Sequence, residues 1–498
     1  MQFHKVALSA FAIFYHAAVA ASAHSKLLTG GTIVAYDEET RLPKVIRDGS
    51  LLVRGDRIAL ISDSALPNNA TTGDVEVIDC TDKIITPGFI DTHRHGWQTV
   101  FKTLGSNTTL AEYAFRYSAL VAQPLFTPED LYISQLAGIH EALNAGVTTI
   151  LDHAHHTWTR ELAAAGLNAS VDSGARVFWA YAFQNVENFG IPDQISQWRE
   201  LASAMSSNRT ALVIAYDGFT NSPEGADTLA VVNLAQYGDY LINSRFGNSP
   251  EVLHRIGILN SSIPIVVSHA TSLTPRGAQL LRSTNQHISI TPESEMHYGH
   301  LHPTSHLILD QASLGVDTHF TFSTDILTQA RMWLQTTRYR VYENTLDRWE
   351  IPARNPFSVN QAFLLATRNG GLALGRKDLG VIAPDAKADI VVWDGRSPSM
   401  LGWSDPIAAV ILHASVGDIE HVLVDGEFVK RDGKLVVEDY KGVQDRFLKS
   451  AKRIQEVLKA TPLPPQEGAF LGTGYPYGQV MEIDAQRGEG TGYGPIYA

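Results

Sequence analysis

The chain has 498 residues, 44% of them hydrophobic and 18% charged, so it is long enough to bury one large core or two. Its formal net charge of −13 argues against nucleic acid and anionic membranes as partners, because both select basic surfaces. The single cysteine, Cys80, excludes an intrachain disulfide. The fold must therefore rest on its core alone, which this length allows.

Residues 1–23 have the pattern of a secretory signal peptide. Lys5 supplies a positive start, residues 6–20 are almost wholly apolar, and small residues follow as cleavage sites. The apolar run is short for a membrane span, and a buried N-terminal helix is the alternative. Five Asn-x-Ser/Thr sequons favour a eukaryotic secretory route, so the chain is expected to be secreted. The expected glycosylation sites are Asn69, Asn107, Asn168, Asn208 and Asn260.

Short strands separated by polar turns fill residues 24–86. The turn Arg54-Gly55-Asp56, for example, separates two apolar runs. This texture predicts the first part of a small β-sandwich. The strands expected here are Leu27–Val34, Ser50–Val53, Arg57–Ile61, Val75–Asp79 and Lys83–Thr86.

From residue 87 to residue 370, apolar runs alternate with helical stretches such as Pro128–Ala145 and Pro275–Ser283. This alternation predicts parallel strands joined by helices. Eight such units predict an α/β fold, a (β/α)₈ TIM barrel whose active site lies where the strands end. The predicted strands end near Asp91, Asp152, Tyr181, Asp217, Phe246, His269, Thr291 and Asp325.

Short strands return in residues 371–440, where Val424-Asp425-Gly426-Glu427 has the pattern of a hairpin turn. We therefore expect a discontinuous β-sandwich formed by both ends of the chain, with the barrel inserted. Residues 441–498 are expected to form an amphipathic helix, Lys441–Lys459, and a tail rich in Gly and Pro. The strands expected before this helix are Ala388–Trp393, His421–Val424 and Glu427–Val429.

Two histidines, His93 and His95, lie one residue apart where the first barrel strand ends. Alternate residues of a strand share a face, so both imidazoles can point toward one metal ion. Neutral imidazole suits Zn²⁺ and similar divalent ions. Two ordinary surface histidines are the alternative, which the position after a barrel strand disfavours.

A carboxylate, Asp325, ends the hydroxyl-rich segment Thr321–Asp325 that is predicted as the eighth strand. A barrel closes its first strand against its eighth, so Asp325 should face His93 and His95. Beside a cation it would stay ionised as a metal ligand, and it could take a proton from a metal-bound water. The alternative is the N-cap of a helix that begins near Leu327.

His269 ends the predicted sixth strand, after the apolar run Ile265–Ser268. A buried core histidine is the ordinary alternative. At a strand end it is expected to act in catalysis, by contacting the substrate or by stabilising charge on the oxygen of the reacting carbon.

Further histidines follow two other predicted strands. His153, His155 and His156 follow the second strand, and His297 and His300 follow the seventh. Loop histidines with ordinary hydrogen bonds are the alternative for each of them. As groups they predict a site lined with imidazole, with His155 and His300 in contact with the substrate.

Two carboxylates and an aromatic residue complete the candidate set. Glu293 or Glu295 could supply a general acid, and Glu293 is the residue we assign; a capping charge is the alternative. Trp97 lies two residues after His95, where an aromatic wall would suit a heterocyclic substrate. Simple packing is the alternative for Trp97.

Taken together, these motifs resemble the amidohydrolase superfamily, in particular the branch of cytosine deaminase, S-adenosylhomocysteine deaminase and the triazine hydrolases. Besides Thr86–His95, the segment Gly146–Asp152 is similar to the family's second barrel strand and Leu379–Val392 to its closing segment. The resemblance covers most of the chain. The residues it implies are His93, His95 and Asp325 as metal ligands and His269 as the histidine that assists the reaction.

One segment departs from this family pattern. The resemblance implies a further metal-binding histidine at the end of the fifth strand, but the predicted fifth strand, Tyr240–Gly247, contains none. Arg245 or Asn243 lies nearest the expected place. Arg245, assigned here to substrate binding, then points away, binds an anionic substrate group or replaces the charge of the metal. Two histidines and one carboxylate still give the three protein ligands of a catalytic zinc site.

The sequence thus predicts a secreted, metal-dependent hydrolase of carbon–nitrogen bonds other than peptide bonds, acting on a small cyclic or aromatic substrate. One Zn²⁺ is the expected metal, with Fe²⁺ or Mn²⁺ as alternatives, and it would lower the pKa of a bound water. Two other functions stay open: a lyase, isomerase or decarboxylase of the same fold, and a metal-free, non-catalytic secreted homologue. The expected partner is a small molecule, and a homo-oligomer is left open.

Overall fold

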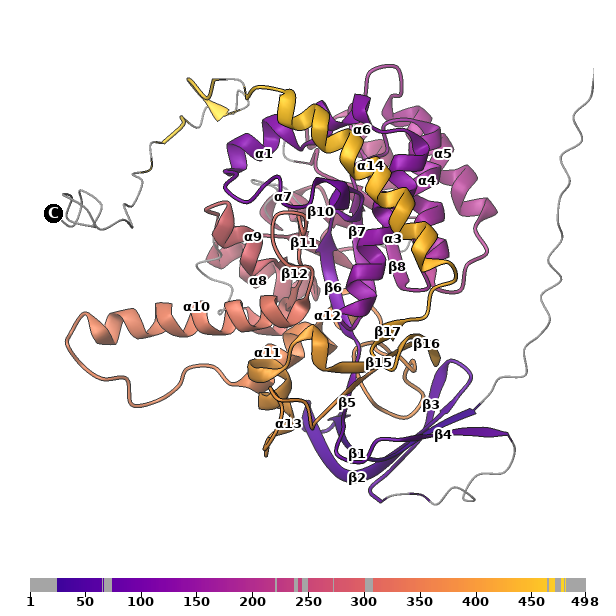
Figure 1. The fold of residues 1–498 in the computed structure, drawn as a ribbon. Helices are drawn as coiled ribbons and strands as arrows, with labels where there is room; N and C mark the ends of the chain where they lie inside the picture. Colours follow the sequence, from indigo (N-terminus) through magenta and orange to yellow (C-terminus); the bar gives the residue numbers. More distant parts are fainter. Residues whose placement is uncertain are drawn as a thin grey trace, which may run out of the picture.

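The computed structural model describes residues 25–64, 66, 74–219, 222–236, 241–243, 250–271, 273–300, 308–463, 465–470, 476–478 and 480. These residues form one sheet of eight strands and one of nine, with helices packed around the first (Figure 1). The predicted signal segment 1–23, the sequon asparagine Asn69 and Arg245 lie outside the described residues. Among the helices that the structure describes, none is long and apolar enough to cross a membrane.

The eight-stranded sheet is parallel throughout, in the order β13-β12-β11-β10-β9-β8-β7-β6. Its two outermost strands also meet, because the amides of Val316 and Asp317 donate to the carbonyl of His93 at 3.0 and 2.8 Å. The end of β13 therefore lies beside the end of β6. The strands are β6 (Phe89–Arg94), β7 (Val147–Ala154), β8 (Arg176–Phe183), β9 (Thr210–Tyr216), β10 (Leu241–Asn243), β11 (Ile265–Ser268), β12 (His287–Ile290) and β13 (Ala312–Leu314).

Nearly continuous apolar runs explain why these segments form a parallel sheet. Every residue of β6, β7 and β8 is buried, which is typical of strands covered on both faces. Threonine caps begin three of the connecting helices: Thr127, Thr159 and Thr274 each accept a hydrogen bond from the third amide of the helix that follows. The helices along this sheet are α3 (Pro128–Asn144), α4 (Arg160–Asp172), α5 (Ile191–Ala204), α6 (Ala226–Ala235), α7 (Pro250–Arg255), α8 (Pro275–Thr284), α9 (Pro292–His297) and α10 (Ile326–Leu346).

The nine-stranded sheet joins the two ends of the chain. β5 pairs antiparallel with β14, with Ile85 opposite Val392, so N-terminal and C-terminal strands share one hydrogen-bonded sheet. The strands are β1 (Ser25–Asp37), β2 (Leu42–Arg54), β3 (Arg57–Ser62), β4 (Val75–Asp79), β5 (Ile84–Pro87), β14 (Ile390–Trp393), β15 (Ile419–Val424), β16 (Glu427–Arg431) and β17 (Lys434–Leu435).

Smaller helical segments connect the two sheets and cover the ends of the strands. They are η1 (Gly96–Phe101), α1 (Leu110–Arg116), α2 (Ala119–Ala122), η2 (Gln123–Leu125), η4 (Leu309–Gln311), α11 (Val359–Ala366), α12 (Arg368–Ala373), α13 (Pro406–Ala408), η5 (Ala409–His413) and η6 (Val416–Asp418). The C-terminal helix α14 (Tyr440–Ala460) packs on α3 and η1 (Figure 1). Because the side-chain amide of Gln455 donates to the carbonyl of Val100 at 2.8 Å, α14 supports the segment that directly follows His95.

A buried group of charges joins the start of β8 to the nine-stranded sheet. Arg176 donates to Asp389 at 3.2 and 3.1 Å and to Asp425 at 2.5 Å. Asp425 also faces Lys387 at 3.0 Å and Arg209 at 3.4 Å. Each charge in this ion-pair network has an opposite charge beside it, as burial requires.

The predicted eighth strand is wrong. The eighth strand is β13, Ala312–Leu314, and the segment Thr321–Asp325 forms no strand but leads into α10. Ser, Thr and Asp side chains hydrogen-bond to nearby backbone and so favour turns and helix caps over strands. Of the predicted fifth strand, Tyr240–Gly247, the structure describes only β10.

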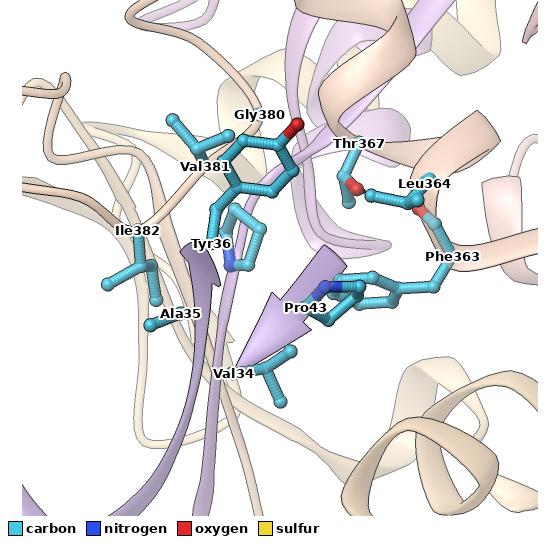
Figure 2. Close-up of a pocket in the computed structure, with 11 residues that line it drawn as sticks. Val34, Ala35, Tyr36, Pro43, Phe363, Leu364, Thr367, Gly380, Val381 and Ile382 are labelled. Carbon is cyan, nitrogen blue, oxygen red and sulfur yellow. Dashed lines mark hydrogen bonds between the residues drawn. The ribbon is translucent and has the colours of Figure 1, made fainter. Parts of the chain in front are cut away.

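A small apolar hollow lies between the nine-stranded sheet and α11 (Figure 2). Its volume of about 10 Å³ is the room that a single water molecule needs. Tyr36 and Thr367 supply the polar side chains of a lining that is otherwise apolar and contains no histidine, carboxylate or cysteine. The hollow therefore offers no chemistry, and the candidate site lies elsewhere.

Candidate active site at the ends of the parallel strands

Two buried histidines stand at the end of β6. The rings of His93 and His95 lie edge to face with their centroids 4.8 Å apart, on one side of the strand as the alternation of a strand predicts. His93 is fully buried and His95 is 4% exposed. Burial by itself disfavours a charged imidazole.

The carboxylate of Asp317 faces both of these histidines. Its Oδ1 lies 3.4 Å from Nε2 of His93 and 3.0 Å from Nε2 of His95. The backbone fixes this arrangement, because Asp317 follows β13 and its carbonyl accepts a hydrogen bond from the amide of His95 at 3.2 Å. The hydroxyl of Ser294 donates to Oδ2 and so leaves Oδ1 directed at the histidines.

Glycine allows the two strand ends to approach this closely. A Cβ atom at Gly315 would lie 2.8 Å from the backbone nitrogen and oxygen of His93, a distance that real Cβ atoms essentially never show. Any side chain at this position would push Asp317 away from β6. The close approach of β13 therefore depends on Gly315.

Contacts behind the histidines set which ring nitrogen faces Asp317. The Nδ1 atom of His95 lies 2.9 Å from the carbonyl of His153, and a carbonyl only accepts, so this nitrogen carries the hydrogen. Nε2 of a neutral His95 then presents its lone pair to Asp317. The Nδ1 atom of His93 lies 2.9 Å from the hydroxyl of Ser268, and this contact holds the ring with Nε2 toward Asp317.

The geometry of these three residues fits a divalent metal. Two histidine nitrogens and one carboxylate oxygen lie within 4.8 Å of one another in His93, His95 and Asp317. Tetrahedral zinc holds such ligands at about 2.0–2.2 Å, so ligand atoms of one ion lie about 3.3–3.6 Å apart. In addition, the buried Nε2 of His93 has no hydrogen-bond partner among the described residues. A buried nitrogen left without a partner is what a metal would satisfy.

The surroundings favour the ligand form of two of these groups. Burial lowers the pKa of His93 to about 4, so the ring is neutral near pH 7. Burial opposes ionisation of Asp317, but His269, His93 and His95 outweigh it and hold its pKa well below the usual range. For His95, burial lowers the pKa and the carboxylate of Asp317 raises it more.

His269 adds a third imidazole from the end of β11. Its Nε2 lies 3.9 Å from Oδ2 of Asp317, and its ring centroid lies 4.9 Å from that of His93. The backbone of His269 (φ 63°) and of Ala270 (φ 44°) is left-handed, which costs a non-glycine residue about 1–3 kcal/mol. Strain of this kind concentrates at functional sites, and here it directs a side chain toward Asp317.

The histidines after β7 have separate positions. His155 is half-buried and its ring stacks on that of His95, with centroids 3.8 Å apart. Nε2 of His153 lies 3.8 Å from the carboxylate of Asp217, which follows β9. His156 is fully buried and packs against Trp179. The structure therefore brings His153 and His155 to the candidate site and places His156 in the core.

Asp325 does not lie with the histidines, and this expectation is corrected. It is the N-cap of α10: its carboxylate accepts hydrogen bonds from the amide and the hydroxyl of Thr328 at 2.6 and 2.8 Å. The carboxylate beside His93 and His95 belongs to Asp317, eight positions earlier in the chain. The error follows from the misplaced eighth strand, and the helix-cap alternative for Asp325 is the right one.

Glu293 also lies apart from the histidines. Its carboxylate accepts hydrogen bonds from Ser323 at 2.7 Å and from Gln329 of α10 at 2.9 Å, and burial raises its pKa. Two positions on, Glu295 lies 3.4 Å from Nδ1 of His269. Of the two carboxylates of α9, the structure therefore places Glu295 at the site.

The residues expected to bind the substrate lie in different places. Trp97 is fully buried, and its ring packs on Trp158 at 5.1 Å and Phe126 at 5.3 Å, which is the packing alternative. The ring of His300 lies edge to face with that of His269 at 5.1 Å. Substrate contacts of His155 and His300 stay predictions, and Arg245 lies outside the described residues.

Sequence reasoning missed Asp317 and undervalued Glu295 against Glu293. The signal for Asp317 was the short run Ala312–Leu314 followed by Gly315 and Val316, an apolar strand ending in a carboxylate. A three-residue strand is too short for period-two alternation to stand out. For Glu295, only the helical turn of α9 decides which carboxylate faces inward.

The family model named Amidohydrolase family matches residues 84–429, and the chain belongs to this family. The chain is 26% identical over 446 residues to 5-methylthioadenosine/S-adenosylhomocysteine deaminase of Pyrococcus abyssi, covering 85% of this chain and 98% of that protein. It is also 26% identical over 423 residues to 5'-deoxyadenosine deaminase of Methanothermobacter thermautotrophicus, covering 80% of this chain and 93% of that protein. The expected membership of the amidohydrolase superfamily is thereby confirmed.

Solved structures share the fold. The zinc complex of atrazine chlorohydrolase TrzN from Arthrobacter aurescens superposes with a TM-score of 0.73 at 17% identity, covering 86% of this chain and all of that one (100%). An adenosine deaminase from Xanthomonas campestris with bound zinc gives a TM-score of 0.73 at 17% identity, covering 88% and 99%. Each match covers most of this chain and nearly all of the solved chain, so this chain shares their overall fold.

Proposed function

We propose that the protein is a metal-dependent hydrolase that cleaves a carbon–nitrogen bond, other than a peptide bond, in a small heterocyclic substrate. The observation that carries the proposal is the convergence of Nε2 of His93 and of His95 on Oδ1 of Asp317. The names of the relatives support the reaction class, because a deaminase replaces an amino group by the oxygen of water. Fold alone would not support it.

We infer that His93, His95 and Asp317 would hold one divalent metal, most simply Zn²⁺, with Fe²⁺ or Mn²⁺ as alternatives. Bound there, the metal would supply Lewis acidity and an acidic water near neutral pH. The residues around it have defined tasks. Asp317 accepts a proton at Oδ1 or Oδ2, and Ser294 steadies Oδ2. His269 places Nε2 beside this carboxylate, and the ring of His155 stacks on that of His95.

We propose further that the eight-stranded sheet is a closed (β/α)₈ barrel. The hydrogen bonds between His93 and the residues after β13 support closure, and so does the parallel bridge between Arg94 and Asp317. The nine-stranded sheet would then be the predicted discontinuous β-sandwich. A separate hydrophobic cluster supports this division, because it lies within the nine-stranded sheet and the segment 381–388 and includes Leu51, Ile85 and Leu423.

We propose that the protein is secreted and glycosylated, on the evidence of the signal-like segment 1–23 and the sequons. Four sequon asparagines lie within the described residues and all four are exposed: Asn107, Asn168, Asn208 and Asn260. A small molecule remains the proposed partner, and the acidic net charge of −13 disfavours nucleic acid and membranes. Expression in a eukaryotic host should yield medium-borne protein whose gel mobility rises on glycosidase treatment. Retention in the cell without such a shift would exclude this route.

A metal and product analysis tests the proposed reaction. Purified protein should contain about one equivalent of metal and release ammonia from at least one of 5'-methylthioadenosine, 5'-deoxyadenosine, guanine or an aminotriazine. Chelation should abolish turnover and zinc should restore it. The variant Asp317→Asn should lose bound metal and lower kcat/KM by more than about 100-fold, beyond what residues behind the ligands usually cause.

Asp325→Asn is the matched control for Asp317→Asn, because asparagine also caps helices and Asp325 lies outside the ligand group. It should keep both metal and turnover. Less than about one tenth of an equivalent of metal, with no gain on adding zinc, would establish the metal-free alternative. Turnover without uptake of water would establish the lyase or isomerase alternative.

A further inference from the structure

A buried threonine and a buried carboxylate lie behind His269. Nδ1 of His269 is 3.0 Å from the hydroxyl of Thr291 and 3.4 Å from Oε1 of Glu295. The same oxygen of Glu295 accepts the amide of Thr291 at 2.9 Å and lies 3.3 Å from its hydroxyl. Thr291 is fully buried and Glu295 is 1% exposed, so the groups interact in a low-dielectric environment.

The hydrogen positions follow from what each group can donate. The Thr291 hydroxyl donates to Oε1 of Glu295, so it has no second hydrogen to give and receives one from Nδ1 of His269. The opposite arrangement, with Thr291 donating to Nδ1, would leave a lone pair of His269 facing the Glu295 carboxylate at 3.4 Å. Two buried acceptors this close to each other are unfavourable, whereas Nε2 of His269 lies 3.9 Å from Oδ2 of Asp317, beyond hydrogen-bond distance. Nδ1 therefore carries the hydrogen of the neutral ring.

We propose that Glu295 is a positioning residue that fixes the tautomer of His269. In this tautomer Nδ1 carries the hydrogen, and the lone pair of Nε2 points toward Asp317, on the side where the substrate would bind. The inference rests on the proposed hydrolase function. In this state neutral His269 accepts a hydrogen bond from an attacking water or a substrate amino group. It does not donate to the oxygen of the reacting carbon, which was one of the two roles expected for it.

The contacts explain why such a device is needed at this position. His269 stands on a left-handed backbone at the end of β11 and is held there by a hydrogen bond from its amide to the carbonyl of Ser289 at 2.8 Å. The backbone sets where the ring lies, but it does not select the protonated nitrogen. That choice is left to Thr291 and Glu295 on the following strand end, as second partners commonly decide for functional histidines.

Nitrogen NMR of histidine-labelled protein tests the tautomer directly. The ¹⁵N resonances of His269, assigned by comparison with His269→Asn, should show hydrogen on Nδ1 in the full-length protein. Glu295→Met removes the acceptor at nearly constant length, which frees the Thr291 hydroxyl to donate to Nδ1. The hydrogen should then move to Nε2. Glu295→Gln keeps an acceptor oxygen, so this conservative variant should restore the native tautomer.

Kinetics provide the second readout. Glu295→Met should lower kcat by about 10–100-fold, the range typical of residues behind functional histidines, with KM changed by less than about threefold and metal content unchanged. Glu293→Met is the matched control for the spectrum, because Glu293 lies on the same helix but contacts Ser323 and Gln329. It should leave the His269 tautomer as in the native protein.

Two results would overturn the inference. One is a native spectrum with hydrogen on Nε2 of His269, a measurement that needs no variant to fold. The other is an unchanged tautomer in Glu295→Met. Both results are independent of turnover. A protein that proves inactive or metal-free would refute the proposed function, and the tautomer measurement would still decide the inference about Glu295.

Discussion

Two groups of buried charged side chains lie at opposite ends of the parallel eight-stranded sheet. At the start of β8, Arg176 is enclosed by Asp389 and Asp425. At the opposite end, where β6 and β13 finish, Asp317 is enclosed by imidazoles, chiefly those of His93 and His95. Both groups are almost inaccessible to water, so burial alone does not distinguish a structural cluster from a functional one.

The difference lies in how completely each group is satisfied. Around Arg176 every carboxylate meets a cation, and Asp389 also accepts the backbone amide of Asp425 at 2.8 Å. Around Asp317 a buried imidazole nitrogen of His93 has no hydrogen-bond partner among the described residues, and the facing atoms are spaced as ligands of one ion. A network in which every buried polar atom has a partner stabilises the fold, whereas a network that leaves a buried nitrogen without a partner can bind a ligand there.

Breaking the complete network should have the largest effect on stability. Arg176→Met should lower the free energy of unfolding by about 3–5 kcal/mol, because it leaves the buried Asp389 without the cation that faces it. Asp425 then keeps only Lys387 and Arg209. Urea titration at pH 7 measures this loss, and metal content should be unchanged. Arg160→Met breaks the exposed Arg160–Glu200 pair and should cost less than about 1 kcal/mol. Equal losses in the two variants would contradict the distinction.

The pH dependence of the stability lost in Arg176→Met gives a second test of the ion-pair network around Arg176. Burial raises the pKa of Asp425, but the charge and hydrogen bond of Arg176 and those of Lys387 lower it more, so its net pKa lies below the ordinary value. A group with a lowered folded-state pKa stabilises the protein above its unfolded pKa, about 3.9, and this stabilisation fades as pH falls toward the folded value. The unfolded chains of the two proteins titrate alike, so the gap in stability between the native protein and Arg176→Met should narrow as the pH falls toward the lowered folded-state pKa of Asp425. A gap that widens in acid would exclude Asp425 as the group responsible.

The order of strands and helices could be predicted from the sequence because local residue patterns determine it. Runs such as Val177–Phe183 and the turn Val424-Asp425-Gly426-Glu427 specify strand and turn with little reference to distant residues. His93 and His95 could be found for the same reason, since both lie at the end of one apolar strand. Where two patterns competed, as in Thr321–Asp325, hydroxyl-rich residues formed a turn and a cap where a strand had been expected.

The partners of these histidines could not be predicted, because they depend on register across the sheet. Asp317 reaches His93 only because β13 passes β6 at Gly315, a contact between residues more than 200 positions apart. Likewise, the choice of Glu295 over Glu293 depends on which side of α9 packs toward β11. Such choices are made by tertiary packing, which a sequence pattern does not encode.

The smallest effect is expected at the carboxylate that the sequence pattern favoured. Asp325→Ala removes the cap of α10 and should lower the free energy of unfolding by about 1 kcal/mol, the usual cost of a lost N-cap. Asp325→Asn should be nearly neutral, because asparagine caps equally well. Metal content and turnover should stay as in the native protein in both variants, since the ligand group contains Asp317 and not Asp325. Loss of metal in Asp325→Ala at unchanged stability would return Asp325 to the ligand set and would mean that the imidazoles at the end of β6 are completed from α10 instead of β13.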